Sequence, residues 1–184
     1  MKLSKNYQYS ILCEDKLTQC YIRRFLITQG INGRKIKALP LPAVGCGEQY
    51  VRQQYPKQLS FLRSRNFISN VLVVAIDADA NTFLERQKQL DETCEKTNVV
   101  QRTSQDKLLL FIPKRNIETW IKFFDGETVD EEHDYAHFLN GHESDCYNAA
   151  DKMAEEFSKQ TFTSELSSLQ FAYKEYTKLV SLLG

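Results

Sequence analysis

Three acidic residues follow two apolar segments that have the length and composition of buried strands. Glu14 comes directly after residues 9–13. Asp77 and Asp79 follow residues 71–76 in the same way. Because a carboxylate is costly to bury, acids at the ends of two buried strands need a partner. A hard divalent cation takes oxygen ligands of this kind, so the three acids predict a Mg²⁺ or Mn²⁺ site rather than a Zn²⁺ site.

The spacing of the second acidic pair supports this interpretation. In an Asp-x-Asp sequence on extended backbone, alternation places the Asp77 and Asp79 carboxylates on the same side of the chain. Two carboxylates that point together repel each other, and a divalent cation relieves that repulsion. The simpler alternative is that Asp79 caps the following helix and Asp77 is a turn residue. The metal site is favoured because Glu14 repeats the same placement on another strand.

The elements that must position these acids alternate along the chain. Strand, helix, strand, helix is the order of a parallel sheet with helices on both faces. In such a sheet, ligands collect outside the carboxyl ends of the strands, where the three acids would lie. We expect an α/β fold with a Rossmann-like sheet of about four parallel strands. The expected strands are residues 7–13, 36–41, 71–76 and 108–112, and the expected helices are residues 16–29, 45–65, 81–96 and one that starts near residue 116.

Two of these helices begin close to the acidic residues. The sequence Gly45-Cys46-Gly47 could present free backbone amides to a phosphate, but Glu48 opposes anion binding and a tight turn is the favoured interpretation. Asn81 and Thr82 are residue types that cap the start of a helix. Several polar residues of that helix are expected to lie mainly on the water-exposed face: Glu85, Arg86, Lys88 and Gln89.

The last third of the chain has a different pattern. Residues 125–143 are acidic and lack periodicity, which predicts a surface loop. Helical periodicity returns in residues 144–159 and 164–183. We therefore divide the chain into an α/β domain, residues 1–124, and a loop with C-terminal helices, residues 125–184, that pack on the same domain.

Further charged residues follow the last predicted strand. Lys114 and Arg115 could neutralise the charge that develops on a phosphate in a transition state, or they could simply be solvated surface residues. Glu118 could be a fourth acidic ligand. It could equally be a first-turn helix acid that the helix dipole favours.

The overall charge limits how the chain could contact a nucleic acid. It has 24 Lys and Arg residues and 24 Asp and Glu residues, so its formal net charge is zero. No global basic field exists to hold nucleic acid by phosphate contacts alone, so contact requires a local patch, a metal or a partner chain. Five cysteines without a CxxC pair, and no apolar signal segment, predict a cytoplasmic protein with reduced thiols. No apolar segment approaches the length of a membrane span.

Three motifs resemble those of the TOPRIM domain family. The first is residues 11–15 (Ile-Leu-Cys-Glu-Asp), and the second is residues 74–79 (Val-Ala-Ile-Asp-Ala-Asp). Residues 112–120 are similar to the Pro-x-x-x-x-Glu-x-Trp stretch of small stand-alone TOPRIM-like proteins of bacterial defence, a branch related to the OLD-type nucleases. The resemblance covers about residues 7–120. The usual glycine of the first-motif turn in many members is absent here, since Asp15-Lys16 follows Glu14.

The resemblance implies Mg²⁺- or Mn²⁺-dependent hydrolysis of a phosphodiester in DNA or RNA. Glu14 would bind metal or act as general acid or base, and Asp77 and Asp79 would be metal ligands, with Glu118 as a fourth. Lys114 would take part in catalysis and, with Arg115, would bind the nucleic acid. Such relatives often work with an ATPase subunit encoded nearby, so we expect that partner and a possible homo-oligomer.

Two other functions compete with the nuclease. One is a non-catalytic TOPRIM-like module that keeps the acids but acts through a partner, which zero net charge supports. The other is a phospho-acceptor receiver, which also places acids and a lysine at strand ends. The distance in sequence from Glu14 to Asp77 is longer than a receiver needs, and the lysine follows its proline as Pro113-Lys114.

Overall fold

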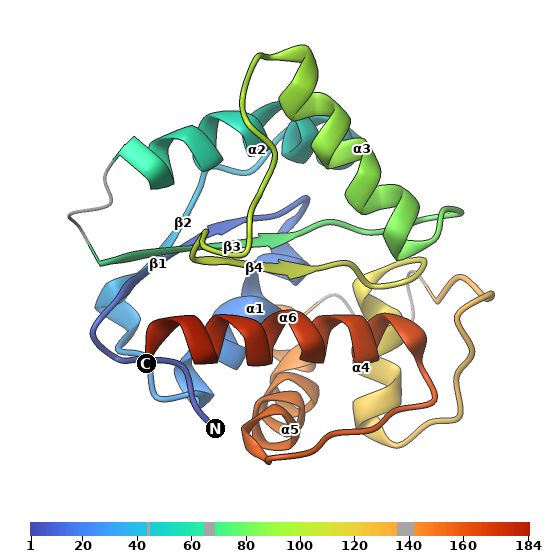
Figure 1. Cartoon of the computed structure of the whole chain (residues 1–184). Coiled ribbons are helices and arrows are strands. Elements are labelled where there is room, and N and C mark those ends of the chain that lie inside the picture. Colours follow the sequence, from blue (N-terminus) through green and yellow to red (C-terminus); the bar gives the residue numbers. More distant parts are fainter. Residues whose placement is uncertain (44, 65–68, 136–141) are drawn as a thin grey trace.

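Four parallel strands form the centre of the molecule (Figure 1). The structure is a computed structural model that describes residues 1–43, 45–64, 69–135 and 142–184. The strand order is β2-β1-β3-β4, and each neighbouring pair is parallel. The predicted α/β fold with a four-stranded parallel sheet is therefore confirmed. The strands are β1 (Gln8–Leu12), β2 (Ile36–Ala38), β3 (Asn70–Ala75) and β4 (Leu108–Phe111).

Helices cover both faces of this sheet. In Figure 1, α2 and α3 lie above the strands, and α1, α4, α5 and α6 lie below them. Arg65, the expected end of the second helix, and residues 136–141 of the expected acidic loop lie outside the described residues. The helices are α1 (Lys16–Thr28), α2 (Gly47–Ser64), α3 (Phe83–Lys96), α4 (Ile117–Asp125), α5 (Tyr147–Ser158) and α6 (Ser167–Leu183), with short 3₁₀ turns η1 (Gly33–Lys35) and η2 (Glu143–Cys146).

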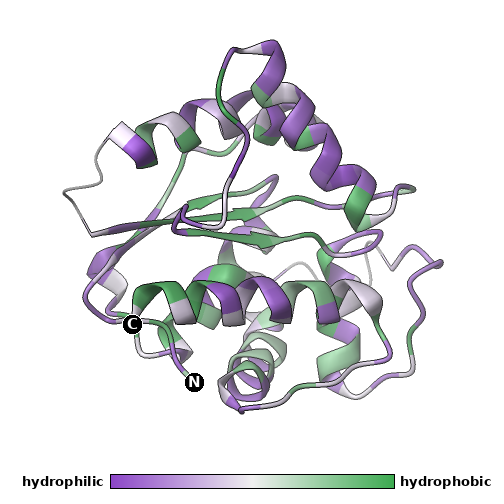
Figure 2. Cartoon of the chain, in the orientation of Figure 1, coloured by the Kyte–Doolittle hydropathy of each residue, from purple (hydrophilic) through white to green (hydrophobic). Residues whose placement is uncertain are grey.

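The strands are apolar on both faces because both faces are covered. Alternate residues point into two separate cores, as the two-residue repeat of a strand requires. In β3, Val71 and Val73 join the core beneath α1, α5 and α6, whereas Leu72 and Val74 join the core beneath α2 and α3. Figure 2 shows the sheet as hydrophobic and the outward surfaces of the helices as largely hydrophilic.

The parallel arrangement brings the ends of three strands to one edge of the sheet. Leu12 is in register with Val74, and Ala75 with Phe111. Pairing continues past the strands, because the amide of Ala78 donates to the carbonyl of Pro113 at 2.9 Å and the amide of Asp79 donates to the carbonyl of Arg115 at 3.1 Å. The segments that follow β3 and β4 are therefore joined to each other.

The C-terminal part of the chain packs on the same sheet. Trp120 of α4 is fully buried and donates from its indole Nε1 to the hydroxyl of Ser168 at 2.8 Å. Glu131, in the acidic segment after α4, accepts hydrogen bonds from the amides of Ser167 and Ser168, both at 2.9 Å. A carboxylate at this position satisfies donors that the first turn of α6 cannot pair internally. The acidic segment is thus attached to the start of the last helix.

Candidate metal-binding site

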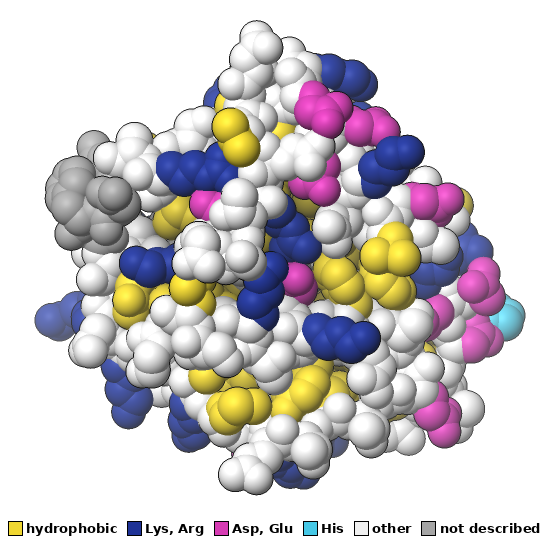
Figure 3. Space-filling view, in the orientation of Figure 1, with side chains coloured by type: hydrophobic (Ala, Val, Ile, Leu, Met, Phe, Trp, Pro, Cys, Tyr) yellow, Lys and Arg dark blue, Asp and Glu magenta, His cyan; other side chains and the backbone are white. Residues whose placement is uncertain are grey.

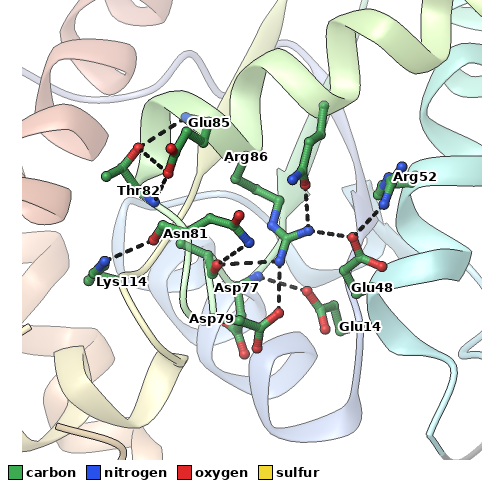
Figure 4. Close-up of polar contacts among 12 residues, drawn as sticks. Glu14, Glu48, Arg52, Asp77, Asp79, Asn81, Thr82, Glu85, Arg86 and Lys114 are labelled. Carbon is green, nitrogen blue, oxygen red and sulfur yellow. Dashed lines mark hydrogen bonds and ion pairs between the residues drawn. The ribbon is translucent and has the colours of Figure 1, made fainter. Parts of the chain in front are cut away.

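The ends of β1 and β3 meet through Glu14 and Asp77. Oε1 of Glu14 accepts a hydrogen bond from the backbone amide of Asp77 at 2.7 Å, although 63 residues separate them in sequence. The two acidic motifs therefore lie side by side at the carboxyl end of the sheet (Figure 4). The strands end on the right of Figure 1, and the acidic side chains visible on this face gather toward the same side in Figure 3.

The Asp77 carboxylate is half-buried and surrounded by negative charge. Burial raises its pKa well above the usual range, and the charges of four other acids raise it further: Glu14, Asp15, Glu118 and Asp79. Within the described part of the chain, neither a hydrogen bond nor an ion pair is made by this carboxylate. An acid in this position lacks a counter-charge, which a bound divalent cation would supply.

Glu14 is held against the start of α2. Burial raises the pKa of its carboxyl to about 7, against the opposing effect of the hydrogen bond from Asp77, while the charge of Asp79 adds to the increase and Arg86 lowers it. A Cβ atom added to Gly47 would lie 2.8 Å from Cβ of Glu14 and 3.2 Å from its backbone oxygen. Gly47 is therefore needed for this close approach, a role beyond the tight turn expected from the sequence.

Asp79 does not cap the following helix, which excludes the simpler alternative for this residue. Thr82 is the N-cap of α3 and forms a capping box with Glu85. Asp79 has a left-handed backbone, with φ of 52°. Its side chain is 61% exposed, and Oδ2 accepts from Nη2 of Arg86 at 2.7 Å. Burial raises the pKa of Asp79, an effect that Arg86 opposes and that Glu48 and Asp134 strengthen.

The prediction that Arg86 lies on the water-exposed face of its helix is wrong. Arg86 is 3% exposed and lies among acidic side chains, in hydrogen-bond contact with Glu48 and Asp79 (Figure 4). It occupies the inward stripe of α3 with Leu90 and Cys94, four and eight residues further on. The charged guanidinium of Arg86 is tolerated in this buried position because the carboxylates of Glu48 and Asp79 compensate for its loss of hydration.

Lys114 and Arg115 are close to the acids but are both engaged. Nζ of Lys114 donates to the backbone oxygen of Asn81 at 2.9 Å. Arg115 has a left-handed backbone, with φ of 64°, and its Nη2 lies 3.8 Å from Oε2 of Glu132. Glu118 lies in the first turn of α4, near enough for its charge to raise the pKa of Asp77.

A residue that the sequence did not single out, Asp134, also borders the site. Its Oδ1 accepts from Nδ2 of Asn116 at 2.6 Å, and its charge raises the pKa of Asp79. With Asp79, Ala80 and Arg115, these two residues line a cavity of about 420 Å³. Part of the segment predicted as a plain surface loop thus belongs to the surroundings of the acids.

The donor chemistry fits a hard cation, but the ligands are not assembled as a cage. Among the residues that the structure describes, no group of three His, Cys, Asp or Glu side chains is arranged to hold a metal ion. Glu14 and Asp77 form the contact at the centre, and one oxygen of Asp79 is bonded to Arg86. The carboxylate of Asp77, without a protein partner in the described ranges, is the feature that fits a cation.

Comparisons with protein-family models, with curated proteins and with solved structures returned no match to this chain. The resemblance to the TOPRIM family therefore depends on the three motifs alone. Of the helices in the described ranges, none has the length and apolar character needed to cross a membrane.

Proposed function

We propose that this protein is a Mg²⁺- or Mn²⁺-dependent nuclease of TOPRIM type that hydrolyses phosphodiester bonds in DNA or RNA. The observation that carries the proposal is the carboxylate of Asp77, which lacks a partner within the described part of the chain. Asp77 is half-buried, and its backbone amide donates a hydrogen bond to Glu14. A strongly perturbed pKa next to a cavity is a feature of functional sites.

Three carboxylates would hold the cation in this proposal. Glu14 and Asp77 are in contact, and Asp79 is accessible to solvent beside them. A bound divalent cation would lower the pKa of a coordinated water and stabilise the leaving oxygen. If Glu14 does not bind the cation, its pKa of about 7 suits it to the alternative role of accepting a proton from the attacking water.

Two cavities that border the acids give room for part of a nucleotide chain. One of about 410 Å³ is lined by Glu14, Lys16 and the apolar residues Leu41, Pro42 and Ala43. The other, of about 420 Å³, contains Arg115 and adjoins Asp79. Both volumes fall in the range of small-molecule sites. Arg115 would contact a phosphate in the second cavity.

The neutral net charge supports a partner that delivers the substrate. A chain with 24 positive and 24 negative residues gains little from non-specific phosphate attraction. We propose, from the family resemblance, that an ATPase subunit of an anti-phage defence system supplies this function. The protein would then act as the effector of that system in the cytoplasm.

One observation favours a second candidate, a non-catalytic TOPRIM-like module. The described acids do not form a ready three-ligand group, and Asp79 already has a cation in Arg86. In this alternative the protein keeps the acids but acts by binding a partner.

The two candidates are separated by a cleavage assay. Purified protein is incubated with single- and double-stranded DNA and RNA, with Mg²⁺, Mn²⁺ or EDTA, alone and with the ATPase encoded beside it. The nuclease predicts metal-dependent products that Asp77→Asn abolishes and that Asp106→Asn, at the other end of the sheet, leaves unchanged. Absence of cleavage in every arm, or cleavage that survives Asp77→Asn, would contradict the proposal.

A further inference from the structure

Arg86 is at the centre of the polar contacts around the acidic residues (Figure 4). Its Nη1 donates to Oε1 of Glu48 on α2 and to Oε1 of Gln89. Its Nη2 donates to the backbone oxygen of Ala78 at 3.3 Å and to Oδ2 of Asp79 at 2.7 Å. One guanidinium therefore joins α2, α3 and the segment that follows β3.

We infer that Arg86 is a positioning residue of the metal site, which fixes the Asp79 carboxylate for metal binding; this inference rests on the proposed function. The guanidinium contacts the side chain of Asp79 and the carbonyl of the residue before it. Arg86 thus holds both the backbone and the carboxylate of the Asp-x-Asp motif. Carboxylate ligands of metals are commonly held by such second hydrogen bonds, which orient them.

The burial of Arg86 indicates that its position is determined by these contacts. Its side chain is 4% exposed, and its Nε is buried without a hydrogen-bond partner among the described residues. A buried, partly unsatisfied guanidinium is unfavourable unless charged partners hold it. The fork geometry of arginine allows Arg86 to contact Glu48 and Asp79 at once, which the single ammonium of a lysine reproduces poorly.

The contact leaves Asp79 available to a cation. The hydrogen bond from Arg86 reaches Oδ2 only, and the side chain of Asp79 is 61% exposed, against 4% for Arg86. Arg86 is itself buried, so it contacts Asp79 from the protein interior and leaves most of the Asp79 carboxylate accessible to solvent. Metal binding and the Arg86 contact are therefore compatible. Because Arg86 already restricts the orientation of the Asp79 carboxylate, less conformational entropy is lost when metal binds.

Arg63 provides a matched control. It donates from Nε and Nη2 to the two carboxylate oxygens of Asp106 at 2.8 and 2.7 Å, and it also contacts the carbonyls of Val100 and Gln101. Like Arg86, this arginine has both carboxylate and backbone carbonyl partners. It lies near the C-terminal end of α2, away from Glu14, so its loss should affect stability alone.

The inference is tested by Mn²⁺ titration followed by electron paramagnetic resonance, which counts free Mn²⁺ and does not require activity. Arg86→Gln should weaken Mn²⁺ binding about 10- to 100-fold, the usual loss when a hydrogen-bond partner of a metal ligand is removed. Arg86→Lys should recover part of that loss. Arg63→Gln should lower the melting temperature and leave the Mn²⁺ affinity unchanged.

Each outcome decides the inference. Unchanged or tighter Mn²⁺ binding by a folded Arg86→Gln protein overturns it, because Arg86 would then be a structural residue or a competitor of the metal. If Arg86→Gln fails to fold, Glu48→Gln, which removes the α2 partner of Arg86, should still weaken binding, and unchanged affinity overturns the inference. Wild-type protein that binds no Mn²⁺ overturns the proposed function as well, so the two failures are distinguishable.

Discussion

Acidic side chains are paired with a cation at one end of the parallel sheet and are in local excess at the other. At the amino end, Asp106 accepts two hydrogen bonds from Arg63 and another from the amide of Thr103 at 2.7 Å. At the carboxyl end, several acids cluster around Arg86, and Asp77 has no partner in the described ranges. Charge that is balanced locally stabilises a fold. A local excess of one sign instead destabilises the fold unless something else binds, which is the property of a functional site.

For this reason, the pKa values of the acids at the two ends are shifted in opposite directions. Burial alone would raise the pKa of Asp106, but the hydrogen bonds from Arg63 and Thr103 outweigh it and lower the pKa. At Asp77 and Glu14, by contrast, burial is the dominant effect. Neighbouring acids add to it, so both pKa values are raised. The same physical terms thus separate a structural acid from a candidate ligand.

The largest expected difference between the two ends is in activity. Asp77→Asn should reduce metal-dependent cleavage by more than about 100-fold, because a direct ligand contributes more than the partners that orient it. Asp106→Asn should leave the rate within about threefold, because Asp106 precedes β4 at the opposite end of the sheet and distant sites act nearly independently. Initial rates at saturating Mg²⁺ measure both. Equal losses in the two variants would show that the comparison concerns stability only.

A second difference concerns stability without metal. Asp106→Ala should lower the free energy of unfolding by about 1–3 kcal/mol, because it leaves the Arg63 guanidinium without its carboxylate. Asp77→Ala should be neutral or stabilising, since it removes an acid that lacks a counter-charge. Urea unfolding of the metal-free proteins measures both values. A larger loss in Asp77→Ala would mean that this carboxylate has a structural partner.

Gly45, just before α2, and Gly47, the first residue of that helix, allow a comparison within the carboxyl end. Gly47→Ala should destabilise the protein by about 1–3 kcal/mol and reduce its response to Mg²⁺, because the new Cβ would displace Glu14. Gly45 has a φ of 81° and open space around it, so Gly45→Ala should cost about 1 kcal/mol through backbone strain alone. Thermal shifts with and without Mg²⁺ separate the effects. An undiminished Mg²⁺ response in Gly47→Ala would contradict the role of Glu14.

The last expected difference is a pH dependence of opposite sign at the two ends. The folded-state pKa of Glu14, about 7, exceeds its usual value of 4.5, so its stability contribution is complete below pH 4.5 and is lost as the pH rises through 7. The pKa of Asp106 is lowered, so its contribution is present at neutral pH and is lost in acid. In metal-free protein, Glu14→Gln should remove part of the loss between pH 5 and 8, since the raised pKa of Asp77 also contributes to it. Asp106→Asn should remove part of the loss in acid. Unfolding curves across this pH range measure both slopes, and a Glu14→Gln protein with the wild-type slope would contradict the assignment.

The sequence predicted the sheet and the meeting of Glu14 with Asp77 because both follow from local pattern. Continuous apolar strands that alternate with helices leave few arrangements, and parallel strands place their ends together. Arg86 was misplaced because its charge was given more weight than its spacing from Leu90 and Cys94, which puts it on the inward face of α3. The helical period was the better guide.

Other features of the site could not be predicted from local pattern. The contact of Asp134 with Asn116 depends on the path of an acidic segment that carries no periodicity. The approach of Gly47 to Glu14 depends on how α2 crosses the sheet, and a Gly-x-Gly sequence is compatible with many turns. These contacts join distant parts of the chain, so only the folded structure specifies them.

The attachment of Glu131 to the first amides of α6 has a consequence for any shortened form of this protein. Asp134 lies three residues beyond Glu131 and borders the cavity beside Asp79. Removing the final helix would therefore release the anchor of a segment that reaches the edge of the sheet where the acids lie, in addition to uncovering apolar surface. A C-terminal truncation that lost cleavage could not be taken as proof that the last helix touches nucleic acid.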